Sequence, residues 1–186
     1  MKRTTSYLVI PIVMLSYFGV CFAKEEKILS TNNEYNGKTI EEIYDVDEEE
    51  YKDGLMRTIT SYDKKGNIIK IQSFYTEEHS AKDGVYSREQ LYEHRMFNRP
   101  KLKRSSFIYT DTHSSTHGLT KAEIHYDEKG NKNKEELWYS DAFAARRNYS
   151  KVEVFYSRGS PEKRVYYDQR GSVVSSEEKK QVWAND

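Results

Sequence analysis

The phrase Y-D-K-K-G-N at Tyr62–Asn67 returns as Y-D-E-K-G-N at Tyr126–Asn131 and as Y-D-Q-R-G-S at Tyr167–Ser172. An aspartate at the first position of a turn accepts hydrogen bonds from backbone N–H groups two residues on, and a glycine three residues later readily takes a positive φ. A type I turn followed by a left-handed glycine connects the two strands of many hairpins. We therefore expect the three aspartates to be turn caps rather than chemical groups.

Runs that alternate polar with apolar or aromatic residues surround these phrases. Alternation with a period of two is the signal of a β-strand. The predicted strands are Leu55–Tyr62, Asn67–Tyr75, Gly84–Tyr92, Lys103–Tyr109, Thr120–Tyr126, Lys132–Tyr139, Lys151–Tyr156 and Lys163–Tyr167. The pattern predicts an all-β fold, an antiparallel meander of about eight to ten strands that forms a curled sheet or an open barrel. Little helix is expected: a short one after Ser140, and a short helix or frayed strand over Ser175–Trp183.

The N-terminus has the features of a secretory signal peptide. Lys2 and Arg3 precede the uncharged run Tyr7–Ala23, which ends at a small residue. We expect cleavage after Ala23 and a secreted or periplasmic protein. An uncleaved anchor and a lipid on Cys21 are the alternatives.

Three segments follow from this division of the chain: the signal peptide 1–23, a flexible N-terminal arm 24–38 and a single β-hairpin-repeat domain 39–186. No transmembrane span is expected after cleavage.

Composition narrows the class of partner. The chain has 30 basic and 30 acidic residues and a formal net charge of +0. Nucleic-acid binding relies on neutralising phosphates, and this balanced charge offers no basic surface for that purpose. The single cysteine lies in the predicted signal peptide, so an exported chain would fold without disulfides. We expect a protein, a glycan or an envelope component as partner, and a homodimer is possible.

The repeated phrases also suggest relatives. The order of Y-D-x-x-G-N, polar strand and aromatic pair resembles two groups of bacterial proteins, the variant MORN-type repeats of secreted and surface proteins and the YD repeats of Rhs-like shells. The resemblance covers Leu55–Ser172, although the phrases start 64 and 41 residues apart, which is less even than a tight repeat array. It implies a β-rich protein with a structural or binding role.

Candidate chemistry is sparse in the sequence. His113 and His117, four residues apart, would face one metal if they lay on a helix. Their surroundings, Asp111–His117, are rich in serine and threonine and follow a predicted strand, so we expect a solvated loop and no metal site. His125 is interpreted as a sheet-surface residue. No catalytic motif, phosphate-binding loop or cofactor site is predicted.

Aromatic pairs are the most distinctive feature of the strands. Adjacent strand residues point to opposite faces, so each pair places one ring on either side of the sheet. One set of rings would form an exposed contact surface; the alternative is that they pack across strands and stabilise a sheet with few aliphatic residues. The candidate contact residues are Trp138, Tyr139, Phe155, Tyr156, Tyr75 and Tyr166.

The sequence therefore predicts an exported, non-enzymatic protein that binds a partner or builds a surface structure. An alternative is a periplasmic carrier of an apolar molecule or lipid in a curled sheet or barrel. Its cavity would be lined by Ile69, Ile71, Ile124, Leu137 and Val154. A hydrolase with an unrecognised pair of carboxylates is a third class.

Overall fold

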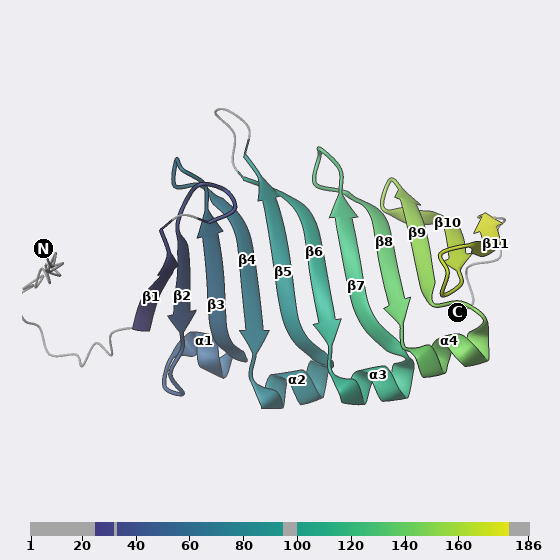
Figure 1. The fold of residues 1–186 in the computed structure, drawn as a ribbon, viewed down its shortest axis with the longest axis horizontal. Helices are drawn as coiled ribbons and strands as arrows, with labels where there is room; N and C mark the ends of the chain where they lie inside the picture. The colour runs from purple at the N-terminus through teal and green to yellow at the C-terminus, as the bar shows by residue number, and fades with distance from the viewer. Residues whose placement is uncertain (1–24, 32, 95–99, 179–186) are drawn as a thin grey trace, which may run out of the picture.

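The computed structural model describes residues 25–31, 33–94 and 100–178. Within these ranges, eleven strands form one antiparallel meander whose spatial order follows the chain (Figure 1). The strands are β1 (Glu25–Ser30), β2 (Thr39–Ile43), β3 (Leu55–Tyr62), β4 (Ile68–Tyr75), β5 (Val85–Glu93), β6 (Lys101–Tyr109), β7 (Leu119–Tyr126), β8 (Lys132–Tyr139), β9 (Lys151–Ser157), β10 (Ser160–Tyr167) and β11 (Val173–Glu178). The helices are α1 (Glu49–Lys52), α2 (Glu77–Asp83), α3 (Asp111–His117) and α4 (Asp141–Arg147).

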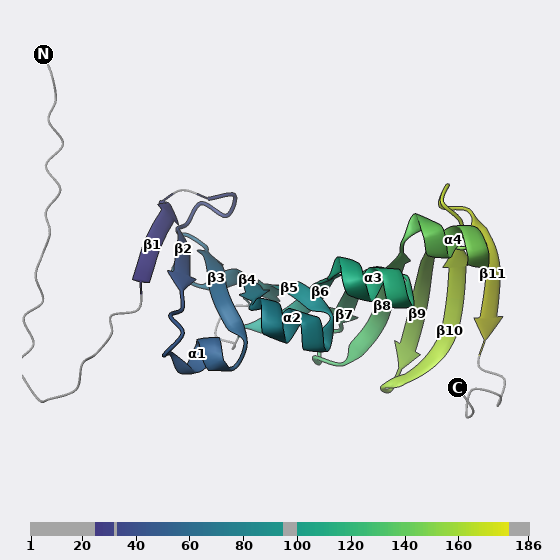
Figure 2. The ribbon, with the colours of Figure 1, turned by 90° about the horizontal axis from the view of Figure 1, so that it is seen from below.

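The sheet is open, with β1 at one end and β11 at the other (Figures 1 and 2). This confirms the predicted all-β antiparallel meander and its curled-sheet form, with eleven strands in place of eight to ten. β11 occupies the start of the segment for which a helix or a frayed strand was expected, and its six residues are all exposed. The rest of that segment, beyond residue 178, lies outside the described residues, as do the predicted signal peptide, Cys21 and the cleavage site.

The range 24–38 contains β1 and a hydrogen-bonded loop, whereas the sequence predicts a flexible arm there. β1 pairs with β2, and Ile28 lies opposite Ile40. In the loop, the side chain of Asn33 accepts hydrogen bonds from the N–H groups of Tyr35 and Gly37 and donates to the carbonyl of Tyr62. The pairing with β2 and the bond to Tyr62 join residues that are apart in the sequence, so they cannot be seen in the local pattern.

The three aspartate phrases are turns, as predicted. The Oδ1 atoms of Asp63, Asp127 and Asp168 each accept two backbone N–H hydrogen bonds, from the residues two and four positions on, at 2.8–2.9 Å. The following glycines, Gly66, Gly130 and Gly171, have φ values of 83°, 85° and 79°. The first two phrases connect β3 to β4 and β7 to β8 at one end of the strands, which we call the turn edge (Figure 1).

At the opposite end of the strands, which we call the helical edge, α2, α3 and α4 connect β4 to β5, β6 to β7 and β8 to β9 (Figure 1). The predicted helix after Ser140 is confirmed as α4. The loop predicted over Asp111–His117 is wrong, because this stretch is α3. The hydroxyl of Thr110 accepts a hydrogen bond from the N–H of His113, and Gly118 ends the helix with φ 79°. Capping by these two residues outweighs the weak helix propensity of the Ser/Thr-rich interior.

Helices α2, α3 and α4 begin with a shared motif that the sequence analysis did not identify. Y-[TS]-[DE]-x-[HF] begins at Tyr75, Tyr109 and Tyr139. In each copy the tyrosine ring stacks on the aromatic ring four residues later, with centroids 4.6–4.8 Å apart. Each second position also donates its backbone N–H to the carbonyl of the glycine that precedes the neighbouring strand. These bonds are Thr76 to Gly54, Thr110 to Gly84 and Ser140 to Gly118, at 2.7–2.8 Å.

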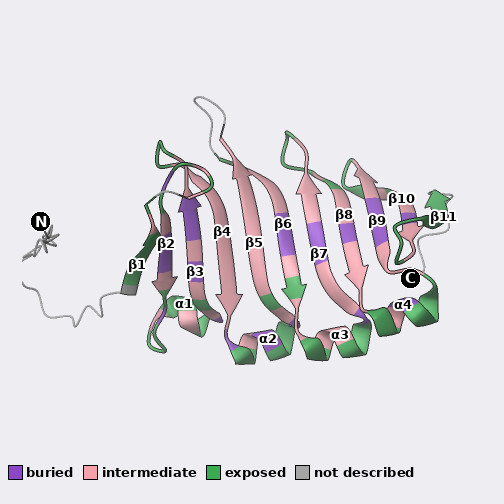
Figure 3. Cartoon of the chain, in the orientation of Figure 1, coloured by how far each residue is buried: buried purple, intermediate pink, exposed green. Residues whose placement is uncertain are grey.

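The helices line this edge and leave both faces of the sheet without a second layer in the described part of the chain (Figures 1 and 2). On one face, which we call the aliphatic face, Ala122, Leu137 and Val152 lie directly opposite one another on β7, β8 and β9. Ala122 and Val152 are buried on this face, and Figure 3 shows buried segments in β6, β7, β8 and β9. The other side is the glutamate face, defined by the row Glu89, Ser106, Glu123, Glu136 and Glu153 on β5–β9.

Candidate functional site

The centre of the glutamate face is a ladder of ion pairs. Glu123, Glu136 and Glu153 lie opposite one another because the strand register aligns them. Residues two positions away on the same strands lie on the same face and supply the cations. Lys134 and Lys151 each contact both Glu136 and Glu153, at 2.8–3.2 Å. A cross-strand arrangement therefore neutralises a row of buried carboxylates.

These contacts set the protonation of the central carboxyls. Burial by itself would raise the pKa of Glu136, but hydrogen bonds with Lys151, His125 and Lys134 lower that pKa to about 2. Burial opposes the same effect at Glu153, where hydrogen bonds with Lys151, Lys134 and Tyr167 lower the pKa. Both groups are ionised at neutral pH, so neither holds the proton that a general acid needs.

His125 lies between two members of the ladder. Its Nε2 is 2.8 Å from Glu136 Oε2 and 3.6 Å from Glu123 Oε2, an arrangement of three groups that could hold a metal ion. The same carboxylates already contact Lys121, Lys134 and Lys151. A cation entering this group would have to compete with three ammonium groups, so the geometry favours a structural hydrogen bond.

The predicted aromatic contact residues are divided between the two faces. Trp138 and Phe155 lie on the glutamate face, opposite Lys151 and Lys134. The other four, Tyr75, Tyr139, Tyr156 and Tyr166, lie on the aliphatic face, because adjacent residues alternate along a strand. The six residues therefore do not form one continuous surface.

Tyrosines of the aliphatic face pack mostly against each other and against α4. Tyr149 contacts the rings of Tyr139, Phe143 and Tyr166 with centroids 5.0–6.1 Å apart. Burial, with Tyr149 and Tyr166 nearby, raises the pKa of Tyr139 to about 12. The hydroxyl of Tyr156 donates to Glu135 at 2.7 Å. This packing matches the alternative that the rings stabilise the sheet.

On the glutamate face, rings alternate with cations instead. The ammonium groups of Lys121 and Lys151 lie 4.7 and 5.5 Å from the Trp138 ring centroid. Lys151 is also 5.2 Å from the ring of Tyr167, and Lys134 is 5.7 Å from that of Phe155. The result is a row of half-exposed rings and charges on an uncovered face.

A hollow of about 350 Å³ interrupts this face over β4–β7. Ser87 and Ser106 are short side chains between longer neighbours, which explains the depression. The rest of its lining is Gln72, Phe74, Arg88, Glu89, Arg104, Ile108, Lys121 and Glu123. Ser106 is 7% exposed, and its hydroxyl has no hydrogen-bond partner among the described residues. Sequence reasoning missed this site because its residues come from four strands.

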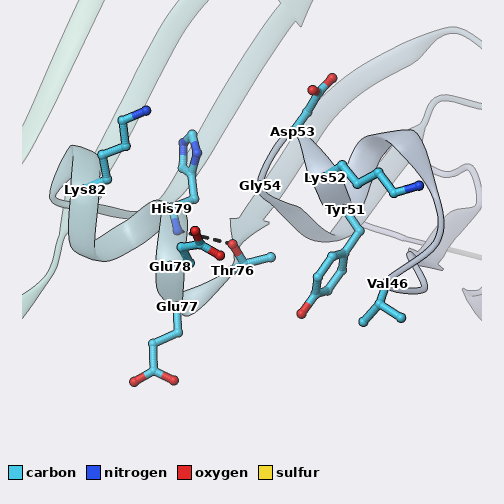
Figure 4. Close-up of a pocket in the computed structure, with 10 residues that line it drawn as sticks. All are labelled: Val46, Tyr51, Lys52, Asp53, Gly54, Thr76, Glu77, Glu78, His79 and Lys82. Carbon is cyan, nitrogen blue, oxygen red and sulfur yellow. Dashed lines mark hydrogen bonds between the residues drawn. The ribbon is translucent and has the colours of Figure 1, made fainter.

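A second concave region, of about 950 Å³, lies between α1 and α2 (Figure 4). Figure 4 shows Val46 and Tyr51 on one side and His79 with Glu77 on the other. α1 spans four residues where the other three helices span seven, which leaves this part of the edge less filled. The lining is mixed, with acidic, basic and apolar side chains.

Four of the five residues proposed to line a carrier cavity lie on the same face of the sheet. Ile71, Ile124 and Val154 lie on the aliphatic face, as does Leu137, and Ile69 falls at an irregularity in the pairing of β3 with β4. Because the sheet is open, this face forms a surface rather than the interior of a barrel.

The two histidines of the predicted loop pack within α3. His113 stacks on Tyr109 and contacts the ring of His117, with centroids 4.6 Å apart in both pairs. Burial and the neighbouring His117 lower the pKa of His113. The repeated tyrosine motif was the signal in the sequence that could have predicted this packing.

Comparison of the chain with protein-family models, with curated proteins and with solved structures finds no match. The resemblance to MORN-type and YD repeats therefore stays a prediction. None of the described helices has the length and the apolar run that crossing a membrane requires.

Proposed function

We propose that this is an exported, non-enzymatic protein that binds a partner through the glutamate face. The observation that carries the proposal is the row of half-exposed rings and cations on that uncovered face, centred on Trp138. Aromatic side chains, tryptophan above all, are enriched where proteins meet partners. The tyrosines of the aliphatic face are engaged in packing, so the contact surface is narrower than the six residues predicted.

The chemistry of the face also favours binding over catalysis. Its central carboxylates are ionised and bound to lysines, which holds them in place as a charged scaffold. A partner of the envelope, a protein or a glycan, would meet fixed charges of both signs next to aromatic rings. Secretion or export to the periplasm, predicted from the first 23 residues, is part of this proposal.

Site-specific photo-crosslinking tests it. A photoreactive phenylalanine analogue replaces Trp138 on the glutamate face or, as the matched control, Leu137 beside it on the aliphatic face. In cells that express the full chain, we expect a discrete adduct from position 138 and none from position 137. Equal adducts from both positions, or none from position 138, would contradict the proposal.

A further inference from the structure

The hollow over β4–β7 is a candidate ligand site because it combines three kinds of lining. Phe74 and Ile108 provide apolar contact, while Glu89 and Arg104 provide fixed charge. The hydroxyl of Ser106 is buried and unpaired among the described residues. Ser106 is short and 7% exposed, so the space above it is left to a ligand.

Charge balance restricts the ligand that fits. Arg104 lies 3.3 Å from Glu89 and 3.7 Å from Glu123, and Lys121 lies 2.8 Å from Glu123. Arg88 also lines the hollow, but its guanidinium lies over Phe107 on the aliphatic face. The remaining two carboxylates and two cations neutralise one another across the hollow. A charged ligand would have to displace one of these pairs, whereas a neutral ligand would leave them intact.

The lining of the hollow offers both donors and acceptors of hydrogen bonds. The carboxylates of Glu89 and Glu123 accept hydrogen bonds, Arg104 and Lys121 donate them, and Gln72 does both. A ligand with many hydroxyl groups, each a donor and an acceptor, can satisfy such a lining without carrying charge. Its C–H groups would rest on Phe74 and Ile108.

The position of the hollow argues against a peptide. Peptides that add to a sheet pair with an exposed outermost strand, where backbone N–H and C=O groups are free. Strands β4–β7 lie in the middle of the sheet and are hydrogen-bonded on both sides. Their backbone hydrogen bonds are thus already used within the sheet, which suits a compact ligand bound by the lining side chains.

We propose that the hollow around Ser106 binds one residue of a neutral saccharide. Its volume of about 350 Å³ falls at the lower end of small-molecule sites, as a single sugar ring requires. Lys121, at its rim, pairs across strands with Trp138, so a longer glycan would continue onto that ring. The inference rests on the proposed function, because it names the ligand class of the same face.

Heteronuclear NMR titration of the purified protein tests the inference. The probes are glucose, galactose, N-acetylglucosamine and cellobiose at millimolar concentration, with glutamate, lysine and inorganic phosphate as charged comparisons. We expect at least one neutral sugar to shift the amide signals of Ser106 and its neighbours. Ser106→Val, which replaces the hydroxyl with a bulkier branched apolar side chain and so narrows the hollow, should weaken that binding at least about tenfold.

Ser73→Val is the matched control, because Ser73 lies on the aliphatic face of β4. It should leave the titration unchanged, and thermal melts verify that both variants fold. The inference is overturned if no neutral sugar shifts these signals, if only charged probes do so, or if Ser106→Val binds as the unaltered protein does. In each case an adduct from position 138 would still show that the glutamate face binds another partner.

Discussion

At one edge of the sheet, β3 and β7 turn through the aspartate–glycine phrase; at the other, β4, β6 and β8 turn through helices (Figure 1). Both edges rely on glycines with positive φ, at 85° for Gly130 and 79° for Gly118. Their surroundings differ. A Cβ at Gly130 would have nothing within 4 Å, whereas a Cβ at Gly118 would lie 2.2 Å from Phe143 of the next helix.

The helical edge is therefore an interlocked array, whereas a Cβ at Gly66 or Gly130 of the turn edge would meet nothing within 4 Å. The ring of His79 covers Gly54, that of His113 covers Gly84 and that of Phe143 covers Gly118. At α4 the series stops, because Asn148 takes the place of the glycine with φ 65°. A left-handed glycine thus serves only the turn itself at one edge, whereas at the other it also makes room for an aromatic ring of the next helix.

The largest expected effect separates these two glycines directly. Gly118→Ala should destabilise the protein by about 3 kcal/mol, because left-handed strain adds to displacement of the Phe143 ring. Gly130→Ala, the matched control, should cost about 1 kcal/mol from the strain alone. Chemical denaturation of both variants measures the difference. Equal losses would mean that the helices are not interlocked.

An intermediate effect is expected from the cap of α3. Thr110→Ala removes the hydroxyl that accepts the N–H of His113, at a cost of about 1 kcal/mol. Thr112→Ala, at an exposed position within the same helix, should cost nothing. Because Ser140 donates its N–H to Gly118, amide exchange should quicken in α4 as well as in α3. Faster exchange in α3 alone would show that neighbouring helices open separately.

The smallest effect concerns pH, and it also distinguishes the edges. The pKa of His113 is lowered from 6.5, mainly by burial, so the folded protein favours the neutral ring. Its contribution to stability is present above pH 6.5 and declines as the pH falls below that value. The pKa of Asp127 is lowered from 3.8 by hydrogen bonds with Asn131, so the contribution of this turn to stability is lost only below about pH 4.

Thermal melts between pH 7 and pH 5 check this difference. The melting temperature should fall slightly in that range, and His113→Phe, which copies the ring at Phe143, should remove the part of the fall due to His113. A fall of the same size in the variant would assign the effect to other groups.

Much of the fold could be read locally. Alternation predicts the eight strands from β3 to β10, and the aspartate phrases predict the turns after β3, β7 and β10, because a turn satisfies its hydrogen bonds within six residues. α4 was predicted from its serine cap, whereas α3 was missed because its interior has low helix propensity. β1 was missed because pairing with β2, rather than its own sequence, stabilises it.

The candidate site could not be predicted from local sequence patterns. Trp138 was predicted from its own strand, but the face on which it meets Lys121 and Lys151 depends on the register of β7, β8 and β9. A shift of one residue would move every side chain to the opposite face. The sequence by itself determined strands, corners and the balance of charge, since these depend on neighbours in the chain. Tertiary structure decided which carboxylates, cations and rings share a face, because cross-strand contacts join residues far apart in sequence.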